Sequence, residues 1–306
     1  MLISYLITVF NKETSIEGTI QSIQNQEGLQ NIEFEIICYD DFSSDNSVKK
    51  IKALQKDDSR IKIFSNERNI GPSKSINKAA QDALGEFLIP IDGDDYIPVD
   101  FTKTILKMQE KHNADLLFGK SKRVSNFPKK IIHLNDEKFF QNLKGFEFCV
   151  QKKICHMGFL VKKKLWHESG GADEKVFIQD QSLPLRLALK SKSMVYLESY
   201  IYFLESRSHL SLSQNTNQQH HDRFFTCINL LETNKLSLCA KKGLEAQLIS
   251  SMWKYQRDNH SYRALFSSIF IIYIFNKLFG CSPKSADIEN WTLFFKNLTD
   301  VRKMYG

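Results

Sequence analysis

The stretch GEFLIPIDGDDY at residues 85–96 joins an apolar run to a cluster of acids. Residues 87–91 are apolar and predict a strand that is buried on both faces, as in a parallel sheet. Asp92, Asp94 and Asp95 follow this run directly. Ligands of an open parallel sheet bind at the carboxyl ends of its strands, so we expect these acids to line a ligand site.

Upstream of this stretch, strand and helix patterns alternate with short connections. Apolar runs predict three more buried strands, at residues 4–9, 34–39 and 61–64. Helical spacing of apolar residues predicts helices at 12–24, 47–55 and 73–83. Asn11 and Ser73 are the expected N-caps of the first and third helices. This alternation is typical of a parallel sheet covered by helices on both faces, and we assign the class α/β.

The rest of the chain has a different rhythm. Its first part predicts helices and strands in mixed order, with helices at 99–111 and 182–190 and strands at 116–118, 130–133 and 158–162. From about residue 215 the pattern is helical, with candidates at 218–231, 235–255 and 262–278. The polar stretch SLSQNTNQQHH lies before these helices. We therefore expect an α/β domain over 1–213 and a helical region over 214–306.

Composition excludes several classes of protein. The 306 residues are 42% hydrophobic and 25% charged, which is globular and not collagen-like or disordered. The six cysteines are scattered without a C-x-x-C pair, so we expect reduced thiols rather than a disulfide framework. The longest apolar run, 264–275, is 12 residues long and contains two serines, whereas about 20 apolar residues are needed to span a bilayer. The N-terminus lacks the features of a signal peptide, and a cytoplasmic location is expected.

The net charge of +7 is unevenly distributed. Residues 1–100 hold 10 Lys and Arg against 17 Asp and Glu, and residues 101–306 hold 32 against 18. Two interpretations remain open. The acidic part contains a metal site and the basic part meets an anionic partner or surface, or the whole surface is mixed and solvated.

The three acids that follow residue 91 repel one another unless a cation or hydrogen-bond donors neutralise them. A hard divalent cation such as Mn²⁺ or Mg²⁺ takes oxygen ligands and keeps positions for phosphate oxygens. Gly93 lets the backbone turn so that two of these side chains can face one ion. The alternative is a solvated acidic turn, which is common at strand ends.

Four linked motifs carry a family resemblance. TVFNKE (8–13), YDDFSSDNS (39–47), NERNIGPSKSINKA (66–79) and GEFLIPIDGDD (85–95) together resemble the family 2 glycosyltransferases. These are inverting enzymes with the nucleotide-sugar-binding GT-A fold. The resemblance implies that residues 1–96 form the nucleotide-sugar-binding half of the catalytic domain and residues 97–213 the acceptor-binding half.

The resemblance also implies roles for residues of the first half. Thr8, Phe10 and Asn11 correspond to the segment that meets the base and ribose, and Lys12 lies near the phosphates. Asp40 and Asp41 match the acid pair of which one meets the base. Asn69 and Gly71 belong to the loop before a helix that contains Asn77. Asp92, Gly93 and Asp94 match the D-x-D motif, in which Asp94 reaches the metal and Asp92 the ribose or metal. Mn²⁺ or Mg²⁺ is the implied cofactor.

In the second half, Gly170 and Gly171 resemble the Gly-Gly turn on the acceptor side. Asp180 occupies the position of the catalytic base, and the alternative is that it is the N-cap of the helix that follows. Arg207 and His209 resemble a late segment that can touch the diphosphate, and by resemblance alone His209 is a candidate metal ligand. The histidines His156, His167, His220 and His221 are expected at the surface rather than at a metal.

This sequence departs from the family pattern at three positions. Phe42 replaces the glycine after the acid pair, which narrows or reshapes the base pocket. Ile76 stands where an arginine is usual, and Lys74 or Arg68 is a candidate to supply that charge. Gln179 replaces the first acid of a Glu-Asp pair. These departures keep open the alternative of a non-catalytic nucleotide-sugar-binding scaffold.

The resemblance thus implies a metal-dependent enzyme that moves a sugar, with UDP-sugars favoured, to a glycan or lipid-linked acceptor in cell-surface polysaccharide synthesis. We expect one addition per acceptor and no nucleic acid partner. The segment 262–278 is apolar around most of its circumference. It is either a membrane-surface helix at the inner face of the membrane or a helix packed on the core or on a second subunit.

Overall fold

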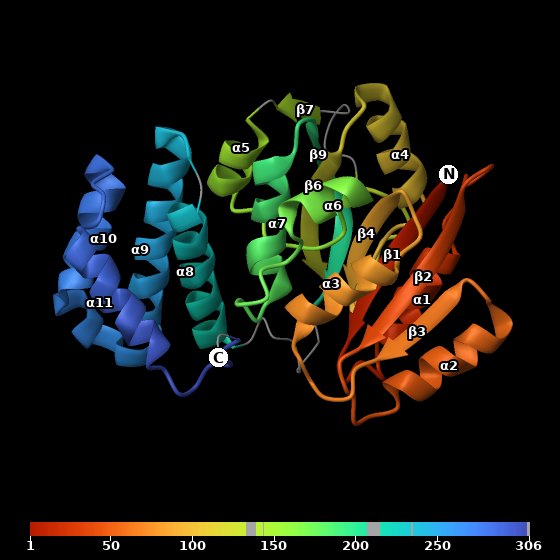
Figure 1. Ribbon diagram of the computed structural model, residues 1–306, viewed down its shortest axis with the longest axis horizontal. Coiled ribbons are helices and arrows are strands. Elements are labelled where there is room, and N and C mark those ends of the chain that lie inside the picture. The colour runs from red at the N-terminus through yellow and green to blue at the C-terminus, as the bar shows by residue number, and fades with distance from the viewer. Residues whose placement is uncertain (133–138, 143, 207–214, 234, 305–306) are drawn as a thin grey trace. The chain divides into compact units, whose positions relative to one another are not determined.

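Strand β1 (Leu2–Val9) lies inside the parallel part of a sheet, with β2 (Glu33–Asp40) on one side and β4 (Phe87–Asp92) on the other. The computed structural model describes residues 1–132, 139–142, 144–206, 215–233 and 235–304 (Figure 1). These residues divide into two compact units. Unit 1 comprises residues 1–145, 155–172 and 186–208, and unit 2 comprises 146–154, 173–185 and 209–306. The boundary at 213/214 stays a prediction.

The parallel half of the sheet in unit 1 has the order β3-β2-β1-β4, where β3 is Ile61–Ser65. Every residue of β1 after Leu2 is buried, as expected of a strand that is covered on both faces. In the register, Thr8 pairs with Asp92 and Val9 pairs with Asp40. The sheet therefore brings the ends of three predicted strands to one edge.

The second half of the sheet is mixed. Strand β8 (Leu160–Lys162) runs antiparallel to β4 and to β6 (Leu116–Val124), and β9 (Met194–Glu205) runs parallel to β6. Two short strands, β5 (Asp95–Tyr96) and β7 (Phe139–Asn142), pair antiparallel with β9. Within the described residues, nine strands thus form one sheet, and the predicted α/β class is confirmed. The sequence interpretation missed β5, β7 and β9.

Unit 1 contains five complete helices in its described residues, and four of them were predicted in whole or in part. The five are α1 (Ile16–Gln24), α2 (Ser47–Asp57), α3 (Pro72–Asp82), α4 (Phe101–His112) and α6 (Lys163–Ser169), of which α6 was not expected. Helix α3 packs on β1 and β2, and α4 packs on β6 and β9.

Both predicted N-caps were wrong. Helix α1 begins at Ile16 with Ser15 at the N-cap position, because Asn11 lies in a loop with a φ of 53°. Helix α3 begins at Pro72 with Gly71 at the N-cap position, and Ser73 lies buried inside the first turn. Pro72 suits that first turn because its missing N–H has no partner in a helix anyway.

Unit 2 is helical in its described residues. It contains α5 (Gly145–Lys152) except its first residue, the first part of α7 (Gln179–Lys190), and then α8 (Thr216–Thr233), α9 (Leu238–His260), α10 (Ser268–Phe279) and α11 (Ser285–Lys296). Helix α8 packs on α9, and α9 packs on α10. The rings of Phe224, Tyr255 and Phe295 meet in the core of this unit.

The prediction of one continuous helix over 262–278 was wrong, because the segment forms two helices. A 3₁₀ helix (Ser261–Phe266) ends at Ser267, and α10 begins after it. The hydroxyl of Ser267 accepts the N–H of Phe270 at 3.3 Å, so Ser267 caps α10 and separates the two segments. Helix α11 was not predicted. Among the ranges given above, no helix has the length and apolar character needed to cross a membrane.

Candidate active site

The acidic stretch after β4 lies against the end of β1. Asp92, the last residue of β4, pairs with Thr8, and its N–H donates to the hydroxyl of Tyr202 at 3.0 Å. A Cβ on Gly93 would lie 3.1 Å from the carbonyl oxygen of Thr8, so glycine permits the close approach of the two backbones. The hydroxyl of Ser15 donates to the carbonyl of Gly93 at 3.1 Å. The turn is thus fixed to β1 and to the start of α1.

Negative charge is concentrated at this turn. The ammonium group of Lys12 lies 2.5 Å from a carboxylate oxygen of Asp94, and both side chains are less than one fifth exposed. Burial holds the pKa of Asp95 well above its usual range, and the nearby charges of Asp92 and Asp94 raise it further. The three carboxyl groups therefore interact, and Lys12 supplies the compensating positive charge.

The acid pair after β2 serves two different contacts. Asp41 is buried and accepts hydrogen bonds from the N–H of Ile70 at 2.7 Å and of Gly71 at 2.8 Å. Burial raises the pKa of Asp41, and these hydrogen bonds oppose the rise. Asp40 accepts from the N–H of Ser43 at 3.2 Å through each carboxylate oxygen. Asp41 thus anchors the loop before α3. The side chain of Asp40 bonds to Ser43 instead.

The loop after β1 is tied to the loop after β2. Asn11 accepts the N–H of Ser44 at 2.9 Å through its side chain, and its own N–H donates to Ser43 Oγ at 3.0 Å. The N–H of Lys12 donates to Ser47 Oγ at 2.7 Å. Phe10 is 44% exposed beside these contacts. The predicted base and ribose segment therefore has a fixed backbone and presents an aromatic ring at the strand ends.

The structure gives a physical reason for the glycine that is usual after the acid pair. Phe42 has a φ of 67°, a left-handed conformation that L side chains rarely adopt, and its side chain is 57% exposed. Ile76 is fully buried in α3, where no charged side chain could replace it without a partner. Lys74 of the same helix is half-buried, and Asn69 donates to the carbonyl of Asp41 at 3.0 Å.

The predicted Gly-Gly turn follows α6. Gly170 and Gly171 have φ angles of 73° and 63°. The guanidinium of Arg186 donates to the carbonyl of Gly171 at 2.7 Å and to that of Ser169 at 3.0 Å. This turn is therefore held by an arginine of the segment L-x-L-R, and it contacts Asn77 of α3.

Asp180 lies in unit 2, and it is the second residue of α7, so the N-cap alternative was wrong. Its side chain is half-buried, and burial raises its pKa from 3.8 to about 6. The charge of Asp222 raises this pKa too, whereas Arg223 and a hydrogen bond from Gln181 at 3.3 Å lower it. A carboxyl group with this pKa is ionised near neutral pH and accepts a proton readily.

Sequence reasoning missed the carboxylate that supports the start of α7. Asp222 is fully buried in α8 and accepts the N–H of Ile178 at 2.7 Å and the side-chain amide of Gln218 at 2.8 Å. The ring of His221 lies 2.8 Å from Asp222, and its side chain is 1% exposed, so the expectation of a surface histidine was wrong. Only the polar run HHD inside a helix with apolar neighbours signals this cluster.

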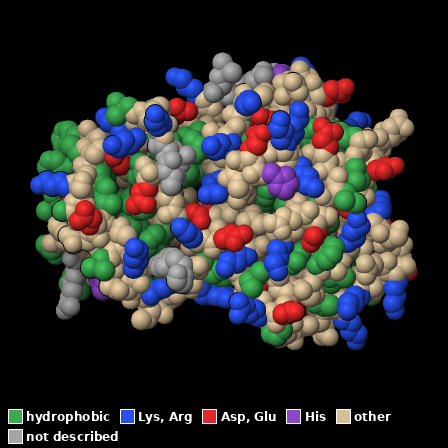
Figure 2. Space-filling model, viewed as in Figure 1, with side chains coloured by type: hydrophobic (Ala, Val, Ile, Leu, Met, Phe, Trp, Pro, Cys, Tyr) green, Lys and Arg blue, Asp and Glu red, His purple; other side chains and the backbone are tan. Residues whose placement is uncertain are grey.

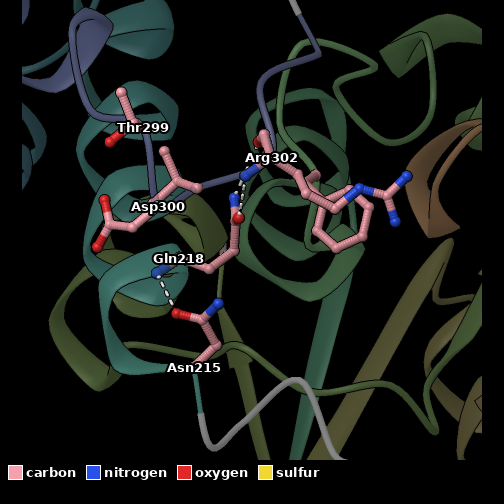
Figure 3. A pocket seen from close by; sticks show the side chains of 7 residues that line it. Asn215, Gln218, Thr299, Asp300 and Arg302 are labelled. Carbon is pink, nitrogen blue, oxygen red and sulfur yellow. Dashed lines mark hydrogen bonds between the residues drawn. The ribbon is translucent and has the colours of Figure 1, made fainter.

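Gln218 also fixes the chain after α11. It accepts the N–H of Arg302 at 2.7 Å and donates to the carbonyl of Arg302 at 3.1 Å (Figure 3). The guanidinium of Arg302 lies 4.5 Å from the ring centre of Phe177. A hollow of about 270 Å³ is lined by these residues together with Asn215, Thr299, Asp300 and Val301.

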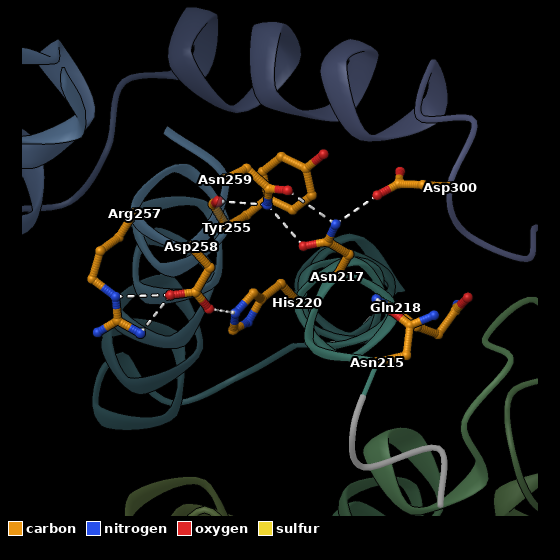
Figure 4. A network of polar contacts seen from close by, with 9 residues as sticks. All are labelled: Asn215, Asn217, Gln218, His220, Tyr255, Arg257, Asp258, Asn259 and Asp300. Atoms are coloured by element: carbon orange, nitrogen blue, oxygen red, sulfur yellow. Dashed lines mark hydrogen bonds and ion pairs between the residues drawn. The ribbon is translucent and has the colours of Figure 1, made fainter. Parts of the chain in front are cut away.

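A second polar network joins α8 to α9 (Figure 4). Asn217 bonds to Asn259 and to Asp300, at 3.1 and 2.6 Å. His220 lies 3.0 Å from Asp258, which also pairs with Arg257 at 2.8 Å. His220 is thus a partner of an acid on the next helix and not an isolated surface side chain.

Two predicted site residues, Arg207 and His209, lie outside the described residues. Among the residues with described positions, no group of three or more His, Cys, Asp or Glu side chains is arranged to hold a metal ion.

The parallel sheet with acidic strand ends, continued by a mixed sheet, defines the GT-A fold of glycosyltransferases. The structure of S. aureus TarS 1-349 in complex with UDP-GlcNAc is similar, with a TM-score of 0.68 and 20% identity over 85% of this chain and 74% of that one. A mannosyltransferase from Pyrobaculum calidifontis in complex with GDP-Man and Mn²⁺ has a TM-score of 0.60 and 12% identity, with coverage of 96% and 84%.

Sequence comparison gives the family. Residues 4–168 match the model of glycosyl transferase family 2, and the chain belongs to this family. The GalNAc(5)-diNAcBac-PP-undecaprenol beta-1,3-glucosyltransferase of Campylobacter jejuni is 26% identical over 277 residues, which is 88% of this chain and 87% of that protein. The chain is therefore a nucleotide-sugar glycosyltransferase, and the family and fold expected from the sequence are confirmed.

Proposed function

We propose that this glycosyltransferase is metal-dependent and inverting, and that it transfers a sugar from a UDP-sugar to a hydroxyl of a glycan or lipid-linked acceptor in cell-surface polysaccharide synthesis. The observation that carries the proposal is the acidic turn 92–95, which lies against the end of β1 and pairs with Lys12. A relative named for an undecaprenol-linked acceptor and a structural neighbour that binds UDP-GlcNAc support the acceptor and the donor.

For the donor nucleotide, we propose that the exposed ring of Phe10 meets the base with Thr8 and Asn11 beside it. Asp40 is the proposed hydrogen-bond acceptor for the base, because Asp41 holds the loop before α3. The proposed contacts of the diphosphate are the cations Lys12, Lys74 and Arg207. Asp92 and Gly93 are proposed to meet the ribose, and Asn69 and Gly71 are proposed to meet the donor from the loop before α3.

The side chains at the acidic turn fit a hard divalent cation. Asp92 and Asp94 supply carboxylate oxygens from adjacent positions of one turn, and Mg²⁺ is usually bound by one or two carboxylates together with substrate phosphates. We propose that these two residues hold Mn²⁺ or Mg²⁺, with His209 as a third candidate. The cation supplies Lewis-acid stabilisation of the charge that develops on the leaving diphosphate. Lys12 adds a positive charge at the same turn.

Asp180 is the proposed base. In an inverting transfer the acceptor oxygen forms a bond to the anomeric carbon while the bond from that carbon to the phosphate oxygen breaks. The acceptor hydroxyl loses its proton to the carboxylate of Asp180, and the nucleoside diphosphate leaves with the electron pair. A positioned base contributes roughly 10²–10⁴-fold to such a rate. The raised pKa of about 6 suits this role, because it lies close to neutral pH.

The first experiment is calorimetric titration of UDP, dTDP, GDP and CMP, each with and without Mn²⁺. It uses the wild type, Asp94→Ala, and Asp57→Ala as a control at an exposed acid of α2. We expect one nucleotide to bind tightly and to need both Mn²⁺ and Asp94. The control should bind as the wild type does.

The alternative of a non-catalytic scaffold predicts a different result. A scaffold would bind the nucleotide without turning over any donor, and Asp180→Asn would leave its nucleotide affinity unchanged. Absence of metal-dependent binding for all four nucleotides would reject the metal-dependent transferase.

A further inference from the structure

Helix α10 has an apolar face that no described residue covers. Ile271, Phe275, Leu278 and Phe279 are spaced as i, i+4, i+7 and i+8, and they are 57%, 51%, 69% and 68% exposed. This spacing places them on one side of an α-helix. The opposite side packs on α9, where Trp253 meets the ring of Phe270 at 4.8 Å. Green side chains gather in Figure 2 over the place of α10 in Figure 1.

The 3₁₀ helix before α10 extends this surface. Tyr262, Leu265 and Phe266 are 69%, 50% and 87% exposed. Single exposed apolar residues are normal on a protein surface, but a contiguous patch of large ones marks an interaction site. We refer to these seven residues of the 3₁₀ helix and α10 together as the apolar face.

The segment that carries the apolar face contains basic residues and no acids. Residues 259–286 contain no Asp or Glu, but they contain Arg263, Lys277 and Lys284. Lys277 and Lys284 are exposed. The next acid along the chain, Asp287, accepts the backbone N–H of Lys284 at 3.2 Å as part of the N-terminal cap of α11. A segment with large exposed apolar side chains and basic residues, but no acids of its own, complements an interface that is apolar inside and anionic outside.

We propose that the apolar face docks on a lipid bilayer that contains anionic lipid, with α10 lying in the plane of the interface. A helix of 12 residues is too short to span the hydrocarbon core. A second copy of the chain is the less favoured occupant, because a two-fold contact would set the apolar face against itself and bring like charges together. The proposal deepens the proposed function, since it places the enzyme at the surface where a lipid-linked acceptor would lie.

Co-sedimentation of the full chain with vesicles tests the proposal. One set of vesicles contains phosphatidylcholine with phosphatidylglycerol, and the other contains phosphatidylcholine alone. We expect the wild type to bind the anionic vesicles more tightly, and Leu278→Asp and Phe279→Asp to lose at least about tenfold in affinity. Lys277→Glu should weaken binding to the anionic vesicles by about fivefold or more, because one basic residue near an anionic surface is worth about 1 kcal/mol.

The matched control is Leu238→Asp. Leu238 begins α9 and is 70% exposed, against 69% for Leu278, but it lies outside the apolar face. It should bind vesicles as the wild type does. Circular dichroism and thermal melting of each variant establish that it is folded, so that lost binding is not a loss of structure.

Three results would overturn the proposal. The first is that the wild type binds neither set of vesicles. The second is that Leu278→Asp binds vesicles as well as Leu238→Asp does. The third is that light scattering shows a wild-type dimer that Leu278→Asp converts to a monomer, and that the wild type does not bind vesicles. The last result would identify a second copy as the occupant. Nucleotide titration is done without vesicles, so failure of the membrane proposal is distinguishable from failure of the proposed function.

Discussion

Asn77 and Ala172 exchange two hydrogen bonds, each 2.9 Å long. The side-chain amide of Asn77 donates to the carbonyl of Ala172, and the N–H of Ala172 donates back to Asn77 Oδ1. An amide side chain thus pairs with the backbone of a residue 95 positions further along the chain. A Cβ on Gly171 would lie 2.2 Å from Asn77 Oδ1, so a glycine is required at that position. The pair fastens α3 to the Gly-Gly turn.

Asn77→Ala should therefore destabilise the protein by about 2–4 kcal/mol. The substitution leaves the N–H and the carbonyl of Ala172 without these partners, and each buried unsatisfied group costs about 1–3 kcal/mol. Urea unfolding measures the loss. The control is Gln81→Ala, an exposed position of the same helix, which should change stability by less than about 0.5 kcal/mol. Equal stability of both variants would show that the pair contributes nothing.

Asp180→Asn should reduce turnover by roughly 10²–10⁴-fold and yet stabilise the fold at pH 8. Burial raises the pKa of Asp180 from 3.8 to about 6, which corresponds to roughly 3 kcal/mol. A raised carboxyl pKa favours folding at low pH, and this contribution is lost as the pH rises through about 6. Asparagine has no charge to bury, so its advantage should be largest at pH 8 and vanish near pH 4. Urea unfolding at the two pH values checks this, and a less stable variant at pH 8 would contradict it.

The pH dependence of turnover should report the same group. A base must be ionised, so kcat/KM, which reports the free enzyme, should rise with pH through a midpoint near 6. Arg223→Gln should move this midpoint to higher pH, because the charge of Arg223 lowers the pKa of Asp180. The control is Arg257→Gln, whose guanidinium pairs with Asp258 of its own helix and should leave the midpoint unchanged. A profile that does not move with Arg223 would exclude Asp180 as the titrating group.

The parallel half of the fold was predictable because its strands are continuous apolar runs that end in polar residues. Residues 87–91 and Asp92 illustrate this, since the run is buried and the acid stands at the strand end. Strand β9 was not predictable in the same way. Glu198 and Ser199 interrupt its apolar pattern, and its pairing with β6 shifts register next to them, between Gly119 and Ser121. An irregular pairing leaves no clean period in the sequence.

The donor site was predictable from motifs, but the separate roles of its two adjacent acids were not. Asp40 and Asp41 are adjacent and alike in sequence, and only the fold shows that Asp41 is engaged by the loop at Ile70 and Gly71. The contact of Asp222 with Ile178 spans 44 residues and has no local pattern. Long-range hydrogen bonds of this kind follow from packing, which the order of residues alone does not encode.

Lys12→Met should make the protein less stable without metal and more responsive to Mn²⁺. Lys12 neutralises Asp94 at 2.5 Å in a largely buried pair, so its removal should cost about 1–3 kcal/mol, between the values for exposed and buried pairs. Added Mn²⁺ should restore more stability to the variant than to the wild type, since a cation replaces the lost charge.

Lys50→Met is the matched control for Lys12→Met. The pair of Lys50 with Glu17 is also 2.5 Å long, but its side chains are 36% and 46% exposed, so its loss should cost little. Thermal melting with and without Mn²⁺ separates the two positions. Equal losses at both, with no difference in the response to Mn²⁺, would show that Asp94 does not depend on Lys12.

Phe42→Gly should stabilise the protein relative to Phe42→Ala by about 1 kcal/mol. Both substitutions remove the same exposed ring, but only glycine adopts a φ of 67° without strain, and a left-handed conformation costs other residues about 1–2 kcal/mol. The greater entropy of glycine in the unfolded chain offsets part of this gain. Urea unfolding of the two variants measures the difference, and equal stabilities would mean that the loop relaxes.

Nucleotide titration of the same two variants then tests whether the ring of Phe42 contacts the donor. Affinity lost equally in both variants would assign Phe42 a contact with the donor, whereas unchanged affinity would leave it only a backbone role.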